Sequence, residues 1–190
     1  MEQHDGTGDT PLDKASKNDA AWLVESILEK RPSSLKSSPS AWKNACEAGR
    51  LSVVRAFVKS SEFQAFCSEE RDTPLHHIKL ESLAEYKNFL RSDEFIEKQK
   101  NTRNKDGATP LHKAIERGDR KLAKALLKAG ADYTIQDKTD HKTAMDLIAE
   151  KCSRDNEWVR MLSPHMLSDM NFFSLSLPIN SIGMELLLKE

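Results

Sequence analysis

The residues that first suggest chemistry are the adjacent histidines His76 and His77, because imidazole nitrogens are common ligands of metal ions. Adjacent residues on a helix point to different sides of it, so the two rings are poorly placed to hold one ion together. No cysteine or carboxylate lies around them at the spacing of a zinc site. We therefore predict no metal site and no cofactor.

The sequence also gives no support for a catalytic nucleophile or a phosphate-binding loop. The three cysteines, Cys46, Cys67 and Cys152, are odd in number and far apart, which argues against a disulfide framework and favours a reducing, cytoplasmic location. Cys46 falls at a packing position of a helix, Cys67 near a helix end or a finger, and no Cys-His or Ser-His-Asp arrangement follows from the spacing. The glycine-rich stretch 6–10 lacks a preceding strand pattern and a following Gly-Lys-Ser/Thr. The sequence predicts a chain that is not an enzyme.

The composition narrows the class of partner. Of 190 residues, 38% are hydrophobic and 31% are charged, and the net charge is -1. No block of the chain is basic enough to make nucleic acid the main partner. The N-terminus does not read as a signal peptide, and no run of about 18 apolar residues occurs, so we expect no membrane span.

These residues are positioned by a unit that recurs along the chain. Five copies of a Thr-Pro-Leu-His-like motif begin at residues 10, 40, 73, 109 and 143, at steps of 30, 33, 36 and 34 residues. Thr can cap a helix N-terminus, Pro suits its first turn, and Leu begins the buried face. His can bond to the backbone of a neighbouring copy. A second helix follows, with apolar residues such as Leu122 and Leu126 on one stripe. Each pair of helices is too small to bury its own stripe, so the copies must stack.

The fourth copy, residues 105–137, resembles a near-consensus ankyrin repeat, and the resemblance extends over about 10–163. It implies an all-α solenoid of antiparallel helix pairs joined by β-turn fingers, with repeats starting near 6, 36, 69, 105 and 139 in a domain 1–163. The second copy departs from the motif with Trp42 and Lys43. The third is followed by the long charged link 91–104, where we expect distortion. Residues 164–190 form an apolar tail that could be a cap, a partner-binding tail or the start of a further domain.

The resemblance also implies a function. Ankyrin-type proteins usually bind other proteins through the finger tips and the exposed side of the first helices, which together form a concave face. We therefore expect a monomeric, non-enzymatic adaptor. The positions that the resemblance selects for protein binding are Glu47, Glu69, Glu70, Asp72, Lys105, Asp106, Glu116, Arg117, Asp140, Lys142 and Glu150. The third-repeat group among them is acidic, which favours a partner segment carrying Lys or Arg. We expect that reversing Glu70 and Asp72 together weakens binding and leaves the fold intact.

An alternative reading is the targeting domain of a secreted bacterial effector, acting in the host cytosol on a host protein or membrane. In that reading the tail 164–190 contributes the output. A basic stripe of Arg117, Lys121, Lys124 and Lys128 fits a solvated outer face, or a docking patch for an acidic protein or an anionic membrane. Trp22, Trp42 and Trp158 fall on or beside apolar helix positions, so we expect all three in the core.

Overall fold

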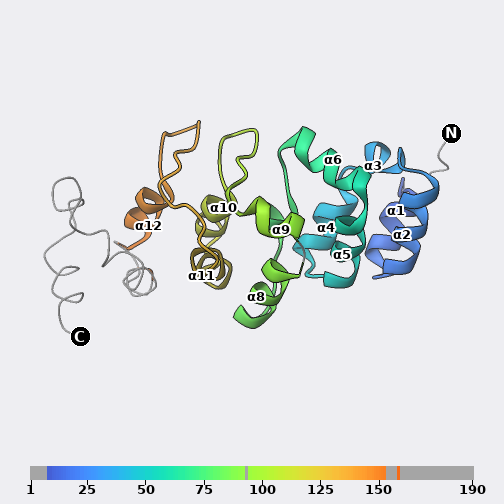
Figure 1. Ribbon diagram of the computed structural model, residues 1–190, viewed down its shortest axis with the longest axis horizontal. Helices are drawn as coiled ribbons and strands as arrows, with labels where there is room; N and C mark the ends of the chain where they lie inside the picture. Colours follow the sequence, from blue (N-terminus) through green and yellow to red (C-terminus); the bar gives the residue numbers. More distant parts are fainter. Residues whose placement is uncertain (1–7, 93, 153–157, 159–190) are drawn as a thin grey trace, which may run out of the picture.

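The computed structural model describes residues 8–92, 94–152 and 158, and it shows a row of helix pairs stacked side by side from the N-terminal to the C-terminal end (Figure 1). The predicted all-α solenoid is confirmed, and the fingers contribute one isolated bridge, Gln136 to Thr143, within the described residues. The paired helices are α1 (Pro11–Lys17) and α2 (Ala21–Lys30), α4 (Ala41–Glu47) and α5 (Leu51–Lys59), α7 (Pro74–His77) and α8 (Leu83–Arg91), and α10 (Pro110–Glu116) and α11 (Arg120–Lys128). Helix α12 (Ala144–Cys152) opens the fifth repeat.

The first helix of each repeat starts largely as the motif predicts. The hydroxyl of Thr10 accepts a hydrogen bond from the amide of Asp13, and Thr109 does the same for His112. Thr143 caps α12 through the amide of Asp146 at 3.1 Å. Ser40 differs, because its side chain makes no cap bond to α4. Four of the five motif starts are therefore Thr residues at the head of a helix, and three of these make the expected bond to the helix amide.

The fourth residue of each of the first four motifs ties its repeat to the next one. In all four cases its partner lies one or two residues before the next motif, so the tie recurs at the same place with different chemistry. The ties are Asp13 to the Ser38 hydroxyl (3.0 Å), Lys43 to the Asp72 carboxylate (2.5 Å), His76 to the Ala108 carbonyl (3.2 Å) and His112 to the Lys142 carbonyl (3.1 Å). The predicted cross-repeat bond of the histidine is confirmed, and it is one instance of a more general tie.

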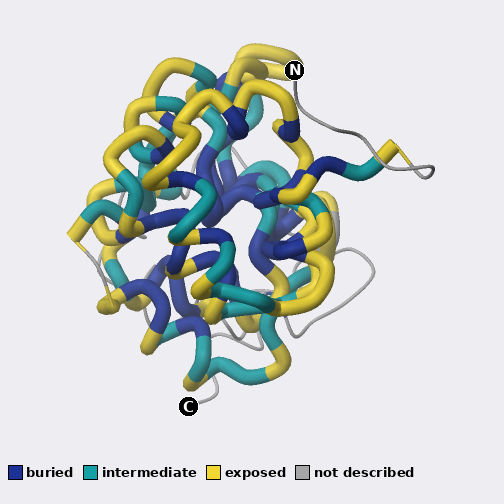
Figure 2. The backbone as a smooth tube through the Cα atoms, turned by 90° about the vertical axis from the view of Figure 1, so that its right-hand side faces the viewer, coloured by how far each residue is buried: buried dark blue, intermediate teal, exposed yellow. Residues whose placement is uncertain are grey.

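The core runs along the stack between the two rows of helices. Figure 2, turned to look along the stack, shows buried backbone at the centre and exposed turns around it. Trp42 and Trp158 are buried as predicted, but the prediction for Trp22 is wrong, because 72% of its surface is exposed. On α2, Trp22 lies three and seven residues before the exposed Glu25 and Glu29, so the helical period places it on their outer face. Its apolar character suggested a burial that its helical position does not allow.

The links between repeats differ most from expectation. Two of them form hairpin fingers, at 103–109 and 136–143, which Figure 1 shows as adjacent loops on one side of the stack. On that same side the N-terminal half carries helices instead, α3 (Ser34–Ser37) and α6 (Ser61–Glu70). Ser60 caps α6 by accepting from the amide of Phe63, and the helix buries Phe63 and Cys67 one turn apart. Cys67 thus lies within a helix, and Glu69 and Glu70 lie on its last turn.

The expected distortion of the third repeat is present, and it begins before the link. Helix α7 ends after one turn at His77, and the usual turn glycine before α8 is absent. The Tyr86 hydroxyl takes over part of that role, since it accepts from the amide of Leu80 and donates to the Asp119 carboxylate in the next repeat. The link itself contains α9 (Glu94–Lys98) and the 3-10 turn η1 (Gln99–Asn101). None of the helices among the described residues is both long and apolar enough to cross a membrane.

Replacing Leu126 with Ala is expected to lower the free energy of unfolding by about 2–5 kcal/mol, because the side chain is fully buried in the fourth repeat. Lys124→Ala, on the exposed side of the same helix, serves as the control and is expected to change stability by less than about 0.5 kcal/mol. Urea denaturation followed by circular dichroism measures both. Equal losses for the two variants would contradict the assignment of the buried stripe.

Candidate protein-binding surface

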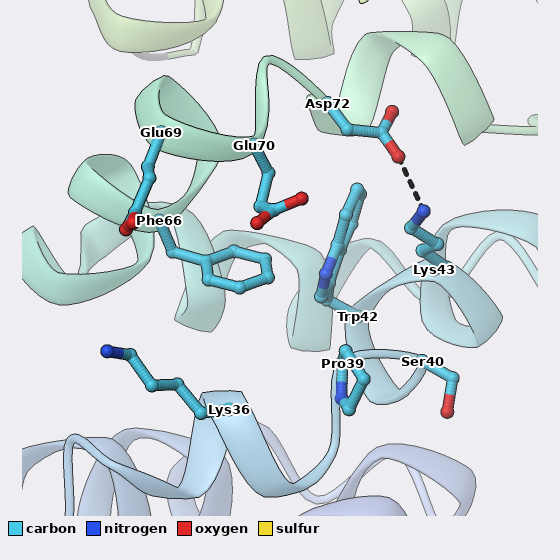
Figure 3. A pocket seen from close by; sticks show the side chains of 9 residues that line it. All are labelled: Lys36, Pro39, Ser40, Trp42, Lys43, Phe66, Glu69, Glu70 and Asp72. Carbon is cyan, nitrogen blue, oxygen red and sulfur yellow. Dashed lines mark ion pairs between the residues drawn. The ribbon is translucent and has the colours of Figure 1, made fainter. Parts of the chain in front are cut away.

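A groove lies on the finger side of the stack, where α3 and α6 take the place of fingers (Figure 3). We call it the α3–α6 groove, and its volume is about 470 Å³. One wall comes from α3 and the start of α4, and the other from the second half of α6 and the chain that follows it. Its lining residues are Lys36, Pro39, Ser40, Trp42, Lys43, Phe66, Glu69, Glu70 and Asp72. Three of the predicted binding residues, Glu69, Glu70 and Asp72, are therefore brought together here.

Trp42 forms the floor of the groove and is held in place from several sides. Its ring meets the Phe63 ring edge-on, with centroids 5.5 Å apart, and the His77 ring in the same way at 5.3 Å. The Lys43 ammonium lies 5.4 Å from the ring centroid. Only 1% of Trp42 is exposed, yet its indole nitrogen has no hydrogen-bond partner within the described part of the chain. A rigid aromatic floor thus carries one unsatisfied donor.

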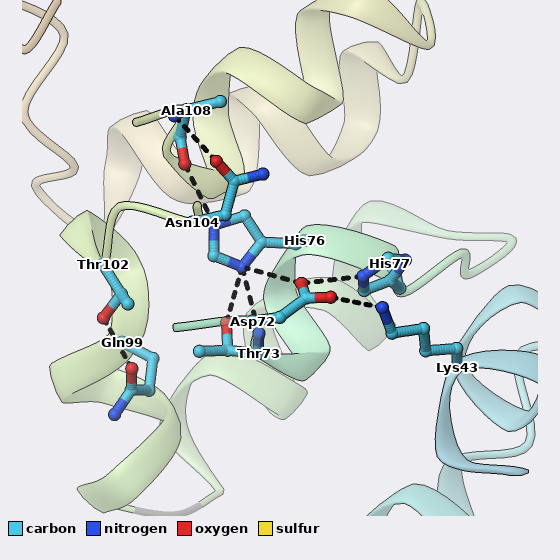
Figure 4. A network of polar contacts seen from close by, with 9 residues as sticks. All are labelled: Lys43, Asp72, Thr73, His76, His77, Gln99, Thr102, Asn104 and Ala108. Carbon is cyan, nitrogen blue, oxygen red and sulfur yellow. Dashed lines mark hydrogen bonds and ion pairs between the residues drawn. The ribbon is translucent and has the colours of Figure 1, made fainter. Parts of the chain in front are cut away.

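Asp72 serves the fold at the edge of the groove. Its carboxylate accepts from Lys43 Nζ at 2.5 Å and from His77 Nε2 at 2.8 Å (Figure 4). Partial burial alone would raise the pKa of Asp72, but the hydrogen bonds from His77 and Lys43 hold it well below its usual range. A lysine at position 72 would face both of these groups. Reversing Asp72 would therefore disturb the fold, contrary to our expectation, and charge is better reversed at Glu69 and Glu70.

The charge of the groove is mixed, and this corrects the acidic centre expected from the sequence. Glu70 forms an ion pair with Lys105 from the next hairpin finger. Lys36 stands on the wall opposite Glu69 and Glu70, as Figure 3 shows. Stacking thus brings Lys36 and Lys43 of the second repeat and Lys105 of the fourth beside the acidic residues of the third.

The remaining predicted residues lie outside the groove. Glu47 is exposed at the end of α4, and Asp106 is exposed in the hairpin 103–109. Arg117 is exposed at the C-terminal cap of α10. Glu116 forms an ion pair with Lys113 at 2.9 Å. Lys142 forms one with Glu150 at 2.7 Å, and the Asp140 carboxylate lies 3.8 Å from the same ammonium. They belong to the fingers and first helices of the second, fourth and fifth repeats and do not converge on one point.

Two apolar residues of the groove, Pro39 and Phe66, were not predicted from the sequence, and Trp42 was predicted only as a core residue. Phe66 lies three residues after Phe63 and one before Cys67, both buried, and is itself half-buried. An aromatic residue at the margin of a buried helical stripe is a signal that could have pointed to it. The pattern was not recognised because residues 61–70 were expected to end in a finger and not to form a continuous helix.

The thiols and histidines considered at the outset have structural surroundings. Burial raises the pKa of both Cys46 and Cys67, which keeps the thiols protonated and poorly nucleophilic. The Thr73 amide donates to His76 Nδ1, so the ring is neutral and Nε2 donates to the Ala108 carbonyl (Figure 4). The described residues contain no group of three or more His, Cys, Asp or Glu side chains placed to hold a metal ion. The residues that first suggested chemistry thus support the fold.

Comparison with known proteins agrees with this geometry. The model of the family described as ankyrin repeats (three copies) matches residues 42–137 and 80–172. The chain therefore belongs to the ankyrin-repeat family, whose members are generally non-enzymatic modules of protein–protein interaction. No curated protein matches the chain. The tail 164–190 and most of residues 153–163, including the end of the predicted repeat domain, lie outside the described residues.

Acid is expected to destabilise the stack through its buried histidines. Burial lowers the pKa of His76 from 6.5 to about 4, and it lowers the pKa of His112 as well. The unfolded chain binds a proton near pH 6.5 while the folded chain does not, so stability is complete above pH 6.5 and falls as the pH drops towards 4. The shift at His76 corresponds to a loss of about 3 kcal/mol over this range.

Urea denaturation at a series of pH values between 7 and 4.5 measures this loss. The His76→Gln variant is the control, because it removes one of the two titrating rings and should give a shallower dependence on pH. Identical dependence in the variant and the wild type would show that His76 is not the neutral, buried group that its hydrogen bonds indicate.

Proposed function

We propose that this chain is an adaptor that binds a protein partner through its concave face, with the α3–α6 groove as the main point of contact. The observation that carries the proposal is the groove itself. It is hollowed into the finger side of the stack, which is the side that carries most of the residues selected by the family resemblance. Binding of proteins is the general role of the family.

The groove is suited to this role because its walls are already in place. Helix α6 packs on α5, and Phe63 of α6 contacts the rings of both Phe57 and Trp42. The Lys43–Asp72 tie holds the chain that follows α6 against α4. A surface that does not need to be ordered on binding loses less conformational entropy, which favours affinity.

The outer row of helices offers a less suitable surface. The predicted basic stripe is divided between two helices, because Arg117 caps the C-terminus of α10 while Lys121, Lys124 and Lys128 are exposed on α11. Lys121 already donates to the carbonyl of Glu81. Lysines spread along one helix face are typical of a solvated surface. The outer face therefore provides the natural control for the proposal.

Site-specific photo-crosslinking tests which face binds. A photoreactive amino acid replaces Glu69 or Glu116 on the finger and first-helix side, and Lys124 or Lys128 on the outer side, with two positions for each face. The full chain is then irradiated in an extract of the cells that produce it, and crosslinked proteins are identified by mass spectrometry. We expect the same protein to be crosslinked from the first two positions and not from the second two.

A partner captured mainly from Lys124 and Lys128 would contradict the proposal and would move the binding surface to the outer helices. Thermal denaturation of each labelled chain checks that the four substitutions leave the fold intact. All four positions are exposed, so changes in stability below about 0.5 kcal/mol are expected.

A further inference from the structure

In the floor of the α3–α6 groove, the indole nitrogen of Trp42 is a hydrogen-bond donor to which the described residues offer no acceptor. A buried donor left unpaired costs about 1–3 kcal/mol, and folded proteins satisfy nearly all of them. The Leu that the repeat motif places here would fill the core without that cost. Figure 3 shows the nitrogen on the edge of the ring that is turned toward Phe66 and Pro39. The donor therefore points to an acceptor that the described part of the chain does not supply.

Two of the carboxylates that line the groove already have partners. Asp72 is bound by Lys43 and His77, and Glu70 by Lys105. Neither carboxylate bonds to the indole, and the residues beside its nitrogen, Phe66 and Pro39, carry no polar side-chain atom. An acceptor reaches the buried nitrogen when the half-buried Phe66 ring turns aside, a side-chain adjustment that is common on binding.

The two walls differ in charge, which limits what can enter. Lys36 stands on α3, and Glu69 and Glu70 stand opposite it on α6. A simple anion would meet the two glutamates, and a simple cation would not use the apolar surface of Phe66 and Pro39. An extended peptide presents a carbonyl, an apolar side chain and a charged side chain within three residues, and about 470 Å³ is enough for such a segment.

We propose that the α3–α6 groove binds an extended segment of the partner in which an aliphatic residue lies next to a lysine or arginine. A backbone carbonyl of the segment accepts the Trp42 indole hydrogen, the aliphatic side chain lies on Phe66 and Pro39, and the cation pairs with Glu69 and Glu70. The cation can replace Lys105 as the partner of Glu70, because 68% of the Lys105 side chain is exposed and such surface ion pairs contribute little to stability. This inference rests on the proposed function and names the chemistry of the partner.

A display library of random twelve-residue peptides, selected on the immobilised full chain, tests the inference. We expect the enriched peptides to share an aliphatic residue adjacent to Lys or Arg. A synthetic peptide of that type, followed by fluorescence anisotropy, is expected to lose about tenfold in affinity with Phe66→Ala, and about tenfold with Glu69→Lys combined with Glu70→Lys. Glu94→Lys combined with Glu97→Lys on α9 changes the net charge equally and should leave the affinity unchanged.

The donor is tested separately by replacing Trp42 with benzothienylalanine, which keeps the shape of the two fused rings and puts sulfur in place of the N–H group. We expect about a tenfold loss of affinity with equal or higher thermal stability, since the unpaired donor destabilises the free chain. Unchanged affinity would show that the indole is only packing.

Enrichment of acidic peptides, of peptides without the aliphatic–basic pair, or of none would overturn the inference. The same holds for affinity that does not respond to Phe66 and to the two glutamates. The proposed function has its own test, because crosslinking from Glu69 and Glu116 would still identify a partner on the concave face. Failure of the peptide experiments alone would thus remove the segment chemistry and leave the adaptor role standing.

Discussion

The structure depends on one recurring constraint: in each of the first four repeats, the fourth residue of the motif bonds to a group that lies just before the next motif. His76 and His112 do this with a neutral imidazole that accepts at its own helix cap and donates to the carbonyl beyond. Lys43 does it with an ion pair to Asp72. Because each tie reaches the chain just before the following motif, it fixes both the spacing of the helix pairs and the path of the link between them.

The candidate site follows from this constraint. With Lys43 in place of His, the tie between the second and third repeats needs a carboxylate, and Asp72 supplies it at the end of a link that contains α6. Helix α6 in turn places Phe66, Glu69 and Glu70 above Trp42. The Lys at position 43 thus replaces the histidine bond with an ion pair to Asp72. The link that ends at Asp72 contains α6, and this helix forms one wall of the groove.

The sequence predicted those features that depend on short spacing within one chain segment. The five motif positions, the threonine caps, the cross-repeat histidine bond and the distorted third repeat all follow from local chemistry repeated at a regular period. The helix α6, the exposed Trp22 and the ion pairs of Lys43 and Lys105 with acidic residues of the third repeat did not follow, because each depends on which segment the stack brings alongside. Glu69 and Glu70 line the groove, although they were expected at a fingertip and lie on a helix; their role in protein binding stays a prediction.

Nuclear magnetic resonance of the indole N–H groups tests whether a partner segment contacts the indole of Trp42. In a ¹⁵N-labelled sample each tryptophan gives one indole signal, and the exposed Trp22 provides an internal reference on the opposite row of helices. Addition of an aliphatic–basic peptide is expected to shift the Trp42 indole proton downfield as it gains an acceptor, while the Trp22 signal stays in place. A Trp42 signal that stays in place while Trp22 moves would contradict the account and locate binding on the outer face.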